Sequence, residues 1–160
     1  EPTVRSVKGL KPIKLATMHL EIEEQDNEVD IVSETSNQHV ALVIKVPYQS
    51  SIDAEVYLGG GISVDNISGN LELEAYQGEV IAKGVSGPIV AETATDDIVI
   101  ELAQFNDTTP TSLTSQTGNI DITLNSDTKA NINVKTYQGE IFSGLANDFI
   151  ATDRIEEKNG

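Results

Sequence analysis

Residues 60–102 read GGISVDNISGNLELEAYQGEVIAKGVSGPIVAETATDDIVIEL, and this stretch decides the fold. A corner residue recurs in it every nine positions, as Gly60, Gly69, Gly78, Gly87 and Asp96. Two and four places after each corner stands a small or apolar residue. A fixed period of this kind is typical of a solenoid, in which short units stack along one axis.

Apolar and polar residues alternate within each nine-residue unit. Successive side chains of a strand point to opposite faces, so Ile62 and Val64 are predicted to face inward and Ser63 outward. A strand this short needs neighbours above and below to pair its backbone and cover its apolar face. Glycine at the corner is expected to allow a positive φ, and Asp96 is a tolerable substitute because Asp also visits that region.

The predicted fold is an all-β parallel β-solenoid, a β-helix-like stack of two parallel sheets across a thin apolar core. Alternate corners, continued by Gly118 and Gly139, give coils of 18 to 22 residues with two short strands each. A β-sandwich, whose strands recur every ~8–12 residues, is the alternative. A β-sandwich explains less well why the corner residue always stands at the same position within the repeat. No run of apolar residues with i, i+3, i+4 spacing continues over three helical turns, so no helix is predicted.

The solenoid is expected to form a single domain over residues 16–151, between an N-terminal arm (1–15) and a C-terminal tail (152–160). Its regular repeats occupy 60–102 and 117–151, and an irregular coil at 103–116 includes a strand near 111–115. The apolar segments between residues 18 and 58, which include a strand predicted at 40–46 and ended by Pro47, are interpreted as earlier, wider turns of the same coil. The motif YQGE of residues 76–79 recurs at 137–140, and strands are predicted at 129–134 and 138–143.

Charge and composition limit the classes of partner. The formal net charge is −16, which disfavours nucleic acid and anionic membranes and leaves cations, basic proteins or neutral glycans. The absence of cysteine excludes disulfides, zinc–thiolate sites and thiol catalysis. No segment approaches the ~20 apolar residues of a membrane span. An opening at Glu1-Pro2 fits an exported chain whose signal segment has been removed, and equally a chain shortened for expression.

Two stretches carry a family resemblance. SGNLELEAYQGEVIAKGVSGPIVAET at residues 68–93, and VIKVPYQSSIDAEV at 43–56 before it, resemble the repeats of a bacterial family of adhesin-like envelope proteins. The resemblance covers residues 40–145. It implies a parallel β-solenoid and an extracytoplasmic location, in the periplasm or at the cell surface, and it supplies no catalytic residues.

An outward apolar row is the candidate partner-binding site. The third position after each corner is predicted to face solvent, and it holds apolar residues at Ile81, Val99 and Phe142 on one sheet and at Val90 on the other. Outward apolar residues in a row are unusual on a soluble protein, so we hypothesise a protein contact surface that includes self-association. The alternative is that the N-terminal arm or the 103–117 segment covers the row.

The acidic run at residues 23–30 offers oxygen ligands to calcium at Asp26, Glu28 and Asp30. It lacks the glycine and spacing of an EF-hand, and a solvated polar turn is the favoured interpretation. No cofactor is expected.

No catalytic motif stands out. His19 and His39 have no Ser or Cys motif to complete a triad, and the glycines do not form a phosphate-binding loop. The expected function is a non-catalytic, adhesin-like module that binds a protein or glycan at the cell surface. The alternatives are a carbohydrate-active β-helix enzyme, which needs clustered carboxylates, and a scaffold that spaces other envelope domains.

If Ile81 and Val99 mediate self-association, replacing both with Thr is expected to lower the mass of the protein in solution, because the apolar contact is lost. Analytical ultracentrifugation measures this mass, and Ser63→Thr in the same row is the control. An unchanged mass together with unchanged partner binding would contradict the hypothesis.

Overall fold

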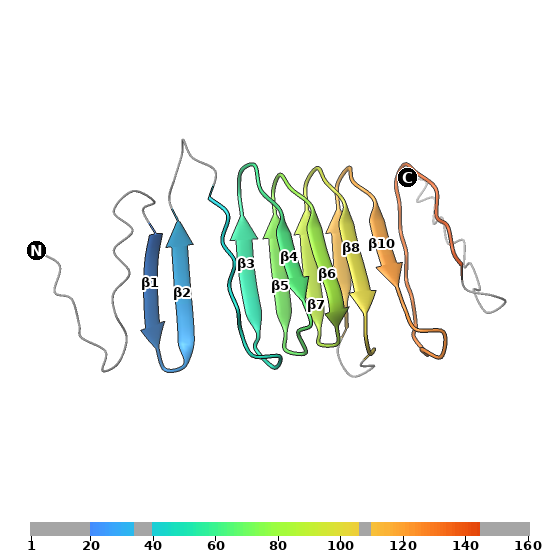
Figure 1. The fold of residues 1–160 in the computed structure, drawn as a ribbon. Helices are drawn as coiled ribbons and strands as arrows, with labels where there is room; N and C mark the ends of the chain where they lie inside the picture. Colours follow the sequence, from blue (N-terminus) through green and yellow to red (C-terminus); the bar gives the residue numbers. More distant parts are fainter. Residues whose placement is uncertain (1–19, 34–39, 106–109, 145–160) are drawn as a thin grey trace, which may run out of the picture. The chain divides into compact units, whose positions relative to one another are not determined.

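The computed structural model describes residues 20–33, 40–105 and 110–144. The chain divides into two compact units, residues 1–46 and residues 47–160. Within the described ranges the secondary structure consists of strands, with no helix (Figure 1). The predicted arm at 1–15, the tail at 152–160 and a strand expected near 147–151 lie outside the described residues.

The first unit contains an antiparallel hairpin of β1 (Leu20–Gln25) and β2 (Glu28–Ser33). Its two-residue loop, Asp26 and Asn27, has φ values of 53° and 67°, as the tight turn of a twisted hairpin requires. The interpretation of this segment as a wider turn of the parallel coil is therefore wrong. The Asp-Asn pair reverses the chain without the glycine that usually marks such turns.

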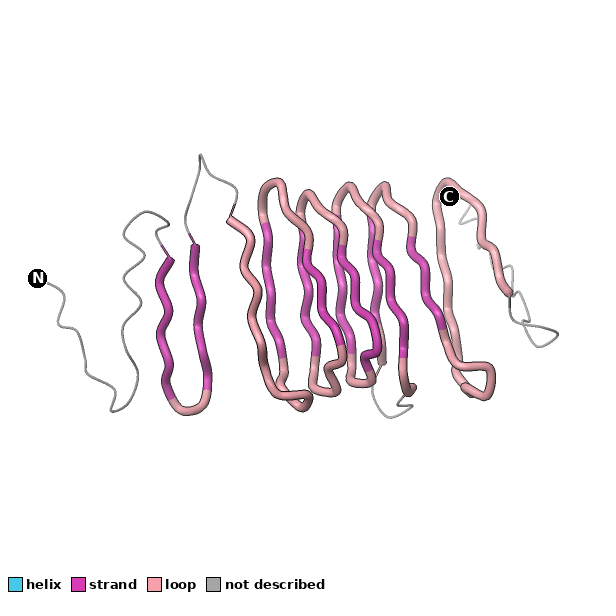
Figure 2. The backbone as a smooth tube through the Cα atoms, in the orientation of Figure 1, coloured by secondary structure: helices cyan, strands magenta, loops and turns pink. Residues whose placement is uncertain are grey.

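The second unit is a parallel β-solenoid of about four turns (Figures 1 and 2). One sheet has the order β3-β5-β7-β9 and the other the order β10-β8-β6-β4, and all neighbouring strands within each sheet are parallel. This confirms the predicted all-β solenoid with two strands per coil. The strands are β3 (Ile52–Val56), β4 (Ile62–Asp65), β5 (Leu71–Ala75), β6 (Val80–Val85), β7 (Ile89–Thr93), β8 (Ile98–Leu102), β9 (Ser112–Ser115) and β10 (Ile120–Thr123).

The coils stack in register. Ile62 pairs with Val80 and Val80 with Ile98, a step of 18 residues each time. Ile98 then pairs with Ile120, 22 residues later. The connection after β8 is longer, but the inward residues of β8 and β10 still pair with each other. The strand expected near 111–115 is confirmed as β9.

The core lies between the two sheets and is made of small aliphatic side chains. Along β4, β5 and β7 its buried members alternate with exposed residues, as the sequence pattern predicts. The largest of them are Leu71, Leu73, Ile89, Ile98, Ile100, Val80 and Val85. Phe105, Leu113 and Leu124 pack against this core and are partly buried.

The corner glycines are required mainly by close approach of neighbouring coils. A Cβ atom on Gly69, Gly87 or Gly118 would overlap the carbonyl oxygen of the equivalent residue one coil earlier. None of these three has a positive φ, so the expected reason for glycine is wrong at these corners. Gly78 has both features: its φ is 150° and a Cβ there would overlap the Gly60 carbonyl.

Asp96 and Gly60 show that the corner tolerates other arrangements. Asp96 does not have a positive φ, and its carboxylate accepts a hydrogen bond of 2.7 Å from the Thr95 hydroxyl. A Cβ atom on Gly60 would lie 3.5 Å from Val56 Cγ1, an ordinary van der Waals contact. Glycine at position 60 is therefore not enforced by a neighbouring backbone.

Three predicted strands are not strands in the structure. Residues 40–46, 129–134 and 138–143 are irregular segments, and their apolar side chains are largely exposed. Each lies outside β3–β10, where parallel neighbours supply the pairing that such short strands need.

Gly87→Ala is expected to lower the free energy of unfolding by about 1–3 kcal/mol, because the added methyl group meets the Gly69 carbonyl and the backbone must shift. Gly60→Ala is the matched control and should change it by less than about 0.5 kcal/mol. Urea denaturation measures both values. Equal destabilisation by the two substitutions would contradict the close-approach explanation.

Candidate acidic face

The outer face of the β3-β5-β7-β9 sheet carries three glutamates in register. Glu55 pairs with Glu74 across β3 and β5, and Glu74 with Glu92 across β5 and β7. All three side chains are exposed. Neighbouring strands lie ~4.8 Å apart, so the carboxylates form a closely spaced row, which we call the acidic ladder. Thr114 of β9 continues it without charge.

A second outward row runs beside the acidic ladder. Asp53 pairs with Glu72, Glu72 with Val90, and Val90 with Ser112. Two more carboxylates therefore lie on the same face, at one end of the row. Val90, one of the predicted contact residues, is 37% exposed within it.

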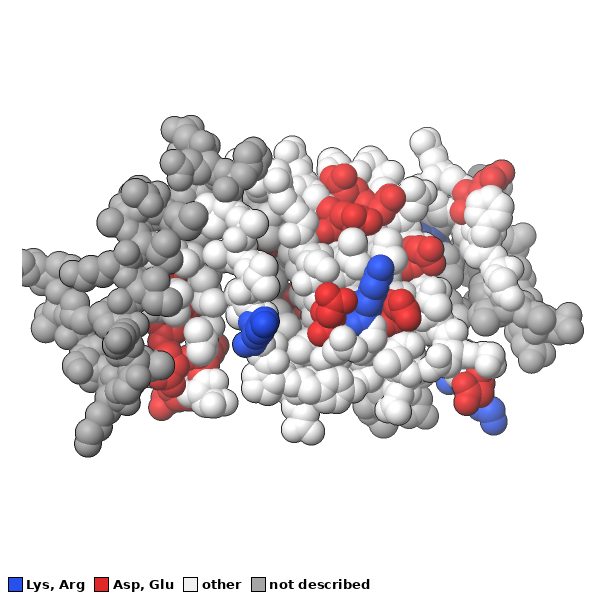
Figure 3. Space-filling view, in the orientation of Figure 1, with Lys and Arg blue, Asp and Glu red and all other residues white. Residues whose placement is uncertain are grey.

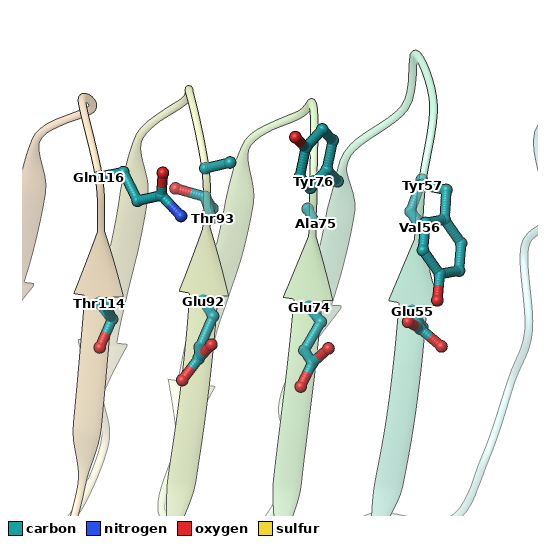
Figure 4. Close-up of a pocket in the computed structure, with 11 residues that line it drawn as sticks. Glu55, Val56, Tyr57, Glu74, Ala75, Tyr76, Glu92, Thr93, Thr114 and Gln116 are labelled. Atoms are coloured by element: carbon teal, nitrogen blue, oxygen red, sulfur yellow. The ribbon is translucent and has the colours of Figure 1, made fainter.

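Two tyrosines flank the acidic ladder where β3 and β5 end. Tyr57 and Tyr76 are 66% and 60% exposed, and a backbone hydrogen bond of 2.9 Å from Tyr76 N to Val56 O continues the pairing there. Figure 4 shows both rings beside the glutamate row. The tyrosines, the acidic ladder, Thr114 and Gln116 line a shallow hollow of about 150 Å³.

Tyr57 and the acidic ladder interact electrostatically. A hydrogen bond from the Tyr57 hydroxyl to Glu55 is the main cause that raises the pKa of Tyr57 above its usual value, and the negative charges of Glu55 and Glu74 add to it. This contact ties the aromatic ring to the carboxylate row.

The outer face of the other sheet has a different charge pattern. There Asp65 pairs with Lys83 and Lys83 with Glu101, so opposite charges alternate along the row. Figure 3 views this side and shows blue and red side chains close together over the β4, β6 and β8 strands. In-register like charges disfavour a sheet, whereas opposite charges favour it. The acidic ladder carries no such compensation within its own row.

The structure brings together only part of the predicted contact row. Ile81 and Val99 are directly paired on β6 and β8, between Ser63 and Asp121, and both are half-buried. Val90 lies on the other sheet, as predicted. Phe142 is 85% exposed and lies in a segment without strand structure, so the described strands do not continue the row to it.

The calcium ligands considered from the sequence lie in and beside the β1–β2 turn. Asp26 is in the turn itself, and Glu28 and Asp30 are on β2. Across residues 20–33, 40–105 and 110–144, no group of three or more His, Asp or Glu side chains is arranged to hold a metal ion. The same residues include no helix with the length and hydropathy of a membrane span.

Sequence reasoning missed the acidic ladder and its tyrosines. The signal was present, because Glu74 and Glu92 each stand five places after a corner glycine, and Tyr76 stands seven places after Gly69. Aligning whole coils by their corners places these residues in rows, whereas reading each strand separately makes them ordinary surface residues.

Comparison with models of known protein families, with curated proteins and with solved structures finds no match. The fold therefore rests on the strand pairing described above, and the resemblance to adhesin-like envelope proteins stays a prediction.

Glu55→Gln is expected to lower the pKa of Tyr57 toward 10.0, because it replaces the anionic hydrogen-bond acceptor with a neutral amide and removes the negative charge of Glu55. Glu74→Gln should lower it less, and Glu92→Gln, which does not contribute to the shift, is the control. Titration of the assigned Tyr57 ring signals by NMR measures this. A Tyr57 pKa that is the same in the Glu55 and Glu92 variants would contradict the contact.

Proposed function

We propose that this chain is a non-catalytic binding module that recognises a basic protein surface through the acidic ladder and its flanking tyrosines. The observation that carries the proposal is the in-register row of Glu55, Glu74 and Glu92 on one rigid sheet face. Stacked like charges disfavour folding, so their concentration on one face is better explained by a cationic partner than by stability.

The geometry suits multivalent contact with cations. Three carboxylates at ~4.8 Å intervals accept hydrogen bonds from several Lys or Arg side chains at once. The exposed faces of Tyr57 and Tyr76 add cation–π contact at the edge of the same hollow. Because parallel coils hold the backbone of every row, little ordering entropy is lost on binding.

Catalysis by this face has less support. A glycosidase acid residue is held in an apolar pocket that keeps it protonated, whereas Glu55, Glu74 and Glu92 are all exposed on a shallow surface. The resemblance to envelope proteins favours a location at the cell surface or in the periplasm. There the module would act as an adhesin-like contact, and a spacer scaffold remains the alternative.

A neutral glycan is the second candidate partner, because Tyr57 and Tyr76 offer two exposed aromatic faces beside polar Thr114 and Gln116. Aromatic rings with nearby hydrogen-bonding groups are common in ligand-binding surfaces. Binding to a neutral polysaccharide such as dextran, abolished by Tyr57→Ala with Tyr76→Ala and retained when the acidic ladder is neutralised, would favour this candidate.

The triple variant E55Q/E74Q/E92Q is expected to bind a fluorescent decalysine peptide at least about tenfold more weakly than the wild type, since each charge-assisted contact contributes more than a neutral one. Fluorescence anisotropy at two salt concentrations measures the affinity, which should fall as salt rises. Its melting temperature should be no lower than that of the wild type, because repulsion within the row is relieved.

The matched control is D65N/E101Q/D121N on the other sheet. Each triple variant removes three negative charges, so both change the formal net charge from −16 to −13. All three control residues are exposed. Equal weakening by the two triple variants would mean that only net charge matters and would refute the proposed site, as would absence of peptide binding to the wild type.

A further inference from the structure

The last coil of the solenoid leaves its apolar core open. On β10, Ile120 and Ile122 are 43% and 39% exposed, although their partners on β8, Ile98 and Ile100, are 0% and 1% exposed. At the opposite edge of the same sheet, the inward residues of β4 are at most 8% exposed. Exposed core residues on a terminal coil are normally covered by a capping unit.

The outer edges of β9 and β10 carry no further strand among the residues that the structure describes. Among the described residues, β10 pairs with β8 alone and β9 with β7 alone. An open strand edge is a template for a further strand. The end of the stack therefore combines apolar side chains with a free edge in each sheet.

Residues 130–143 carry the sequence of one more coil. Gly139 stands 21 residues after Gly118, close to the 22-residue step between Asp96 and Gly118, and it lies in the repeated YQGE motif. In this register Ile141 falls on Ile120. The segment also offers Ile132 and Val134, which with Ile141 are 40%, 49% and 51% exposed.

The corner of that coil already has the required backbone conformation. Gly139 has a φ of 144°, close to the 150° of Gly78, which is the equivalent residue of the first YQGE motif. A Cβ atom on Gly78 would overlap the carbonyl of the preceding coil, whereas one on Gly139 would meet only the Thr136 hydroxyl, at 3.3 Å. The turn at Gly139 is thus formed, but it does not pack against the Gly118 backbone. Figure 2 shows the chain beyond β10 as loop.

We propose that the β9 and β10 edges are a strand-accepting surface and that residues 130–143 of the same chain occupy it as a fifth parallel coil. Ile141 then covers Ile120, and Ser143 lies over Ile122 and gives the end of the stack a more polar surface. Formation of this coil covers the apolar residues that β10 leaves exposed at the end of the stack. The acidic ladder lies on β3, β5 and β7, so this proposal is independent of the proposed function.

The chain's own segment is a better occupant than a second copy. It follows β10 after a short connection, which gives it a high effective concentration at that edge. A second copy brings another net charge of −16, and this repulsion opposes edge-to-edge association. The 21-residue spacing is also within one residue of the preceding coil, and it places Ile141 in phase with Ile120.

Hydrogen exchange of the full chain, followed by mass spectrometry, tests the proposal. Amides at residues 139–143 should exchange at least about tenfold more slowly than in an unstructured peptide of the same sequence, because a docked strand is protected. Gly139→Ala should remove this protection and speed exchange in β10, since its methyl group would meet the Gly118 carbonyl. Gly144→Ala is the control, because a Cβ atom at Gly144 has nothing within 4 Å. It should leave the protection of residues 139–143 and the exchange of β10 unchanged.

Unprotected amides at residues 139–143 in the wild type, or the same exchange pattern in the two alanine variants, would overturn the proposal. Protection that rises with protein concentration together with a dimer mass would overturn it too, because the occupant would then be a second copy. Retained protection of β7 and β8 in Gly139→Ala shows that the remaining coils are folded. A merely local strain at residue 139 would leave the exchange of β10 unchanged.

Discussion

Parallel backbone pairing between successive coils is the constraint on which the structure depends. Each coil donates hydrogen bonds to the next along both sheets, and the pairing continues beyond the strands, as in the bonds of 2.9 Å from Ile62 N to Glu79 O and from Leu71 N to Pro88 O. At a spacing of ~4.8 Å a Cβ atom on Gly69, Gly78, Gly87 or Gly118 would overlap the backbone of the preceding coil. The corner glycines follow from this spacing, and so does a core built from Val, Ile, Leu and Ala.

The same constraint creates the candidate site. Residues 18 or 19 positions apart become direct neighbours, so one glutamate per coil at a constant phase becomes a continuous row. The backbone pairing fixes the position of every row, independently of its side chains. The amino acids of the outward rows can therefore differ between the two sheets. One sheet alternates acidic and basic residues, whereas the other concentrates carboxylates beside two tyrosines, and the proposed function is built on this difference.

The period of nine was sufficient to predict the solenoid, because inward residues and corners share one phase from Gly60 to Leu102. The sequence did not reveal the β1–β2 hairpin, since Asp26 and Asn27 form a tight turn without glycine. It suggested positive φ at the corners, whereas contact with the preceding coil, visible only in three dimensions, explains Gly69, Gly87 and Gly118. The acidic ladder was hidden because its members are distant in sequence and become a site only after stacking.

The most direct test of the account is the pattern of NOE contacts between backbone protons in isotope-labelled protein. Parallel stacking predicts amide–Hα contacts between strands 18 residues apart, linking Ile62 with Val80 and Val80 with Ile98, and likewise Leu73 with Ala91. Close Hα–Hα contacts between consecutive strands such as β5 and β6, which antiparallel hairpins produce, would contradict the solenoid and with it the acidic ladder.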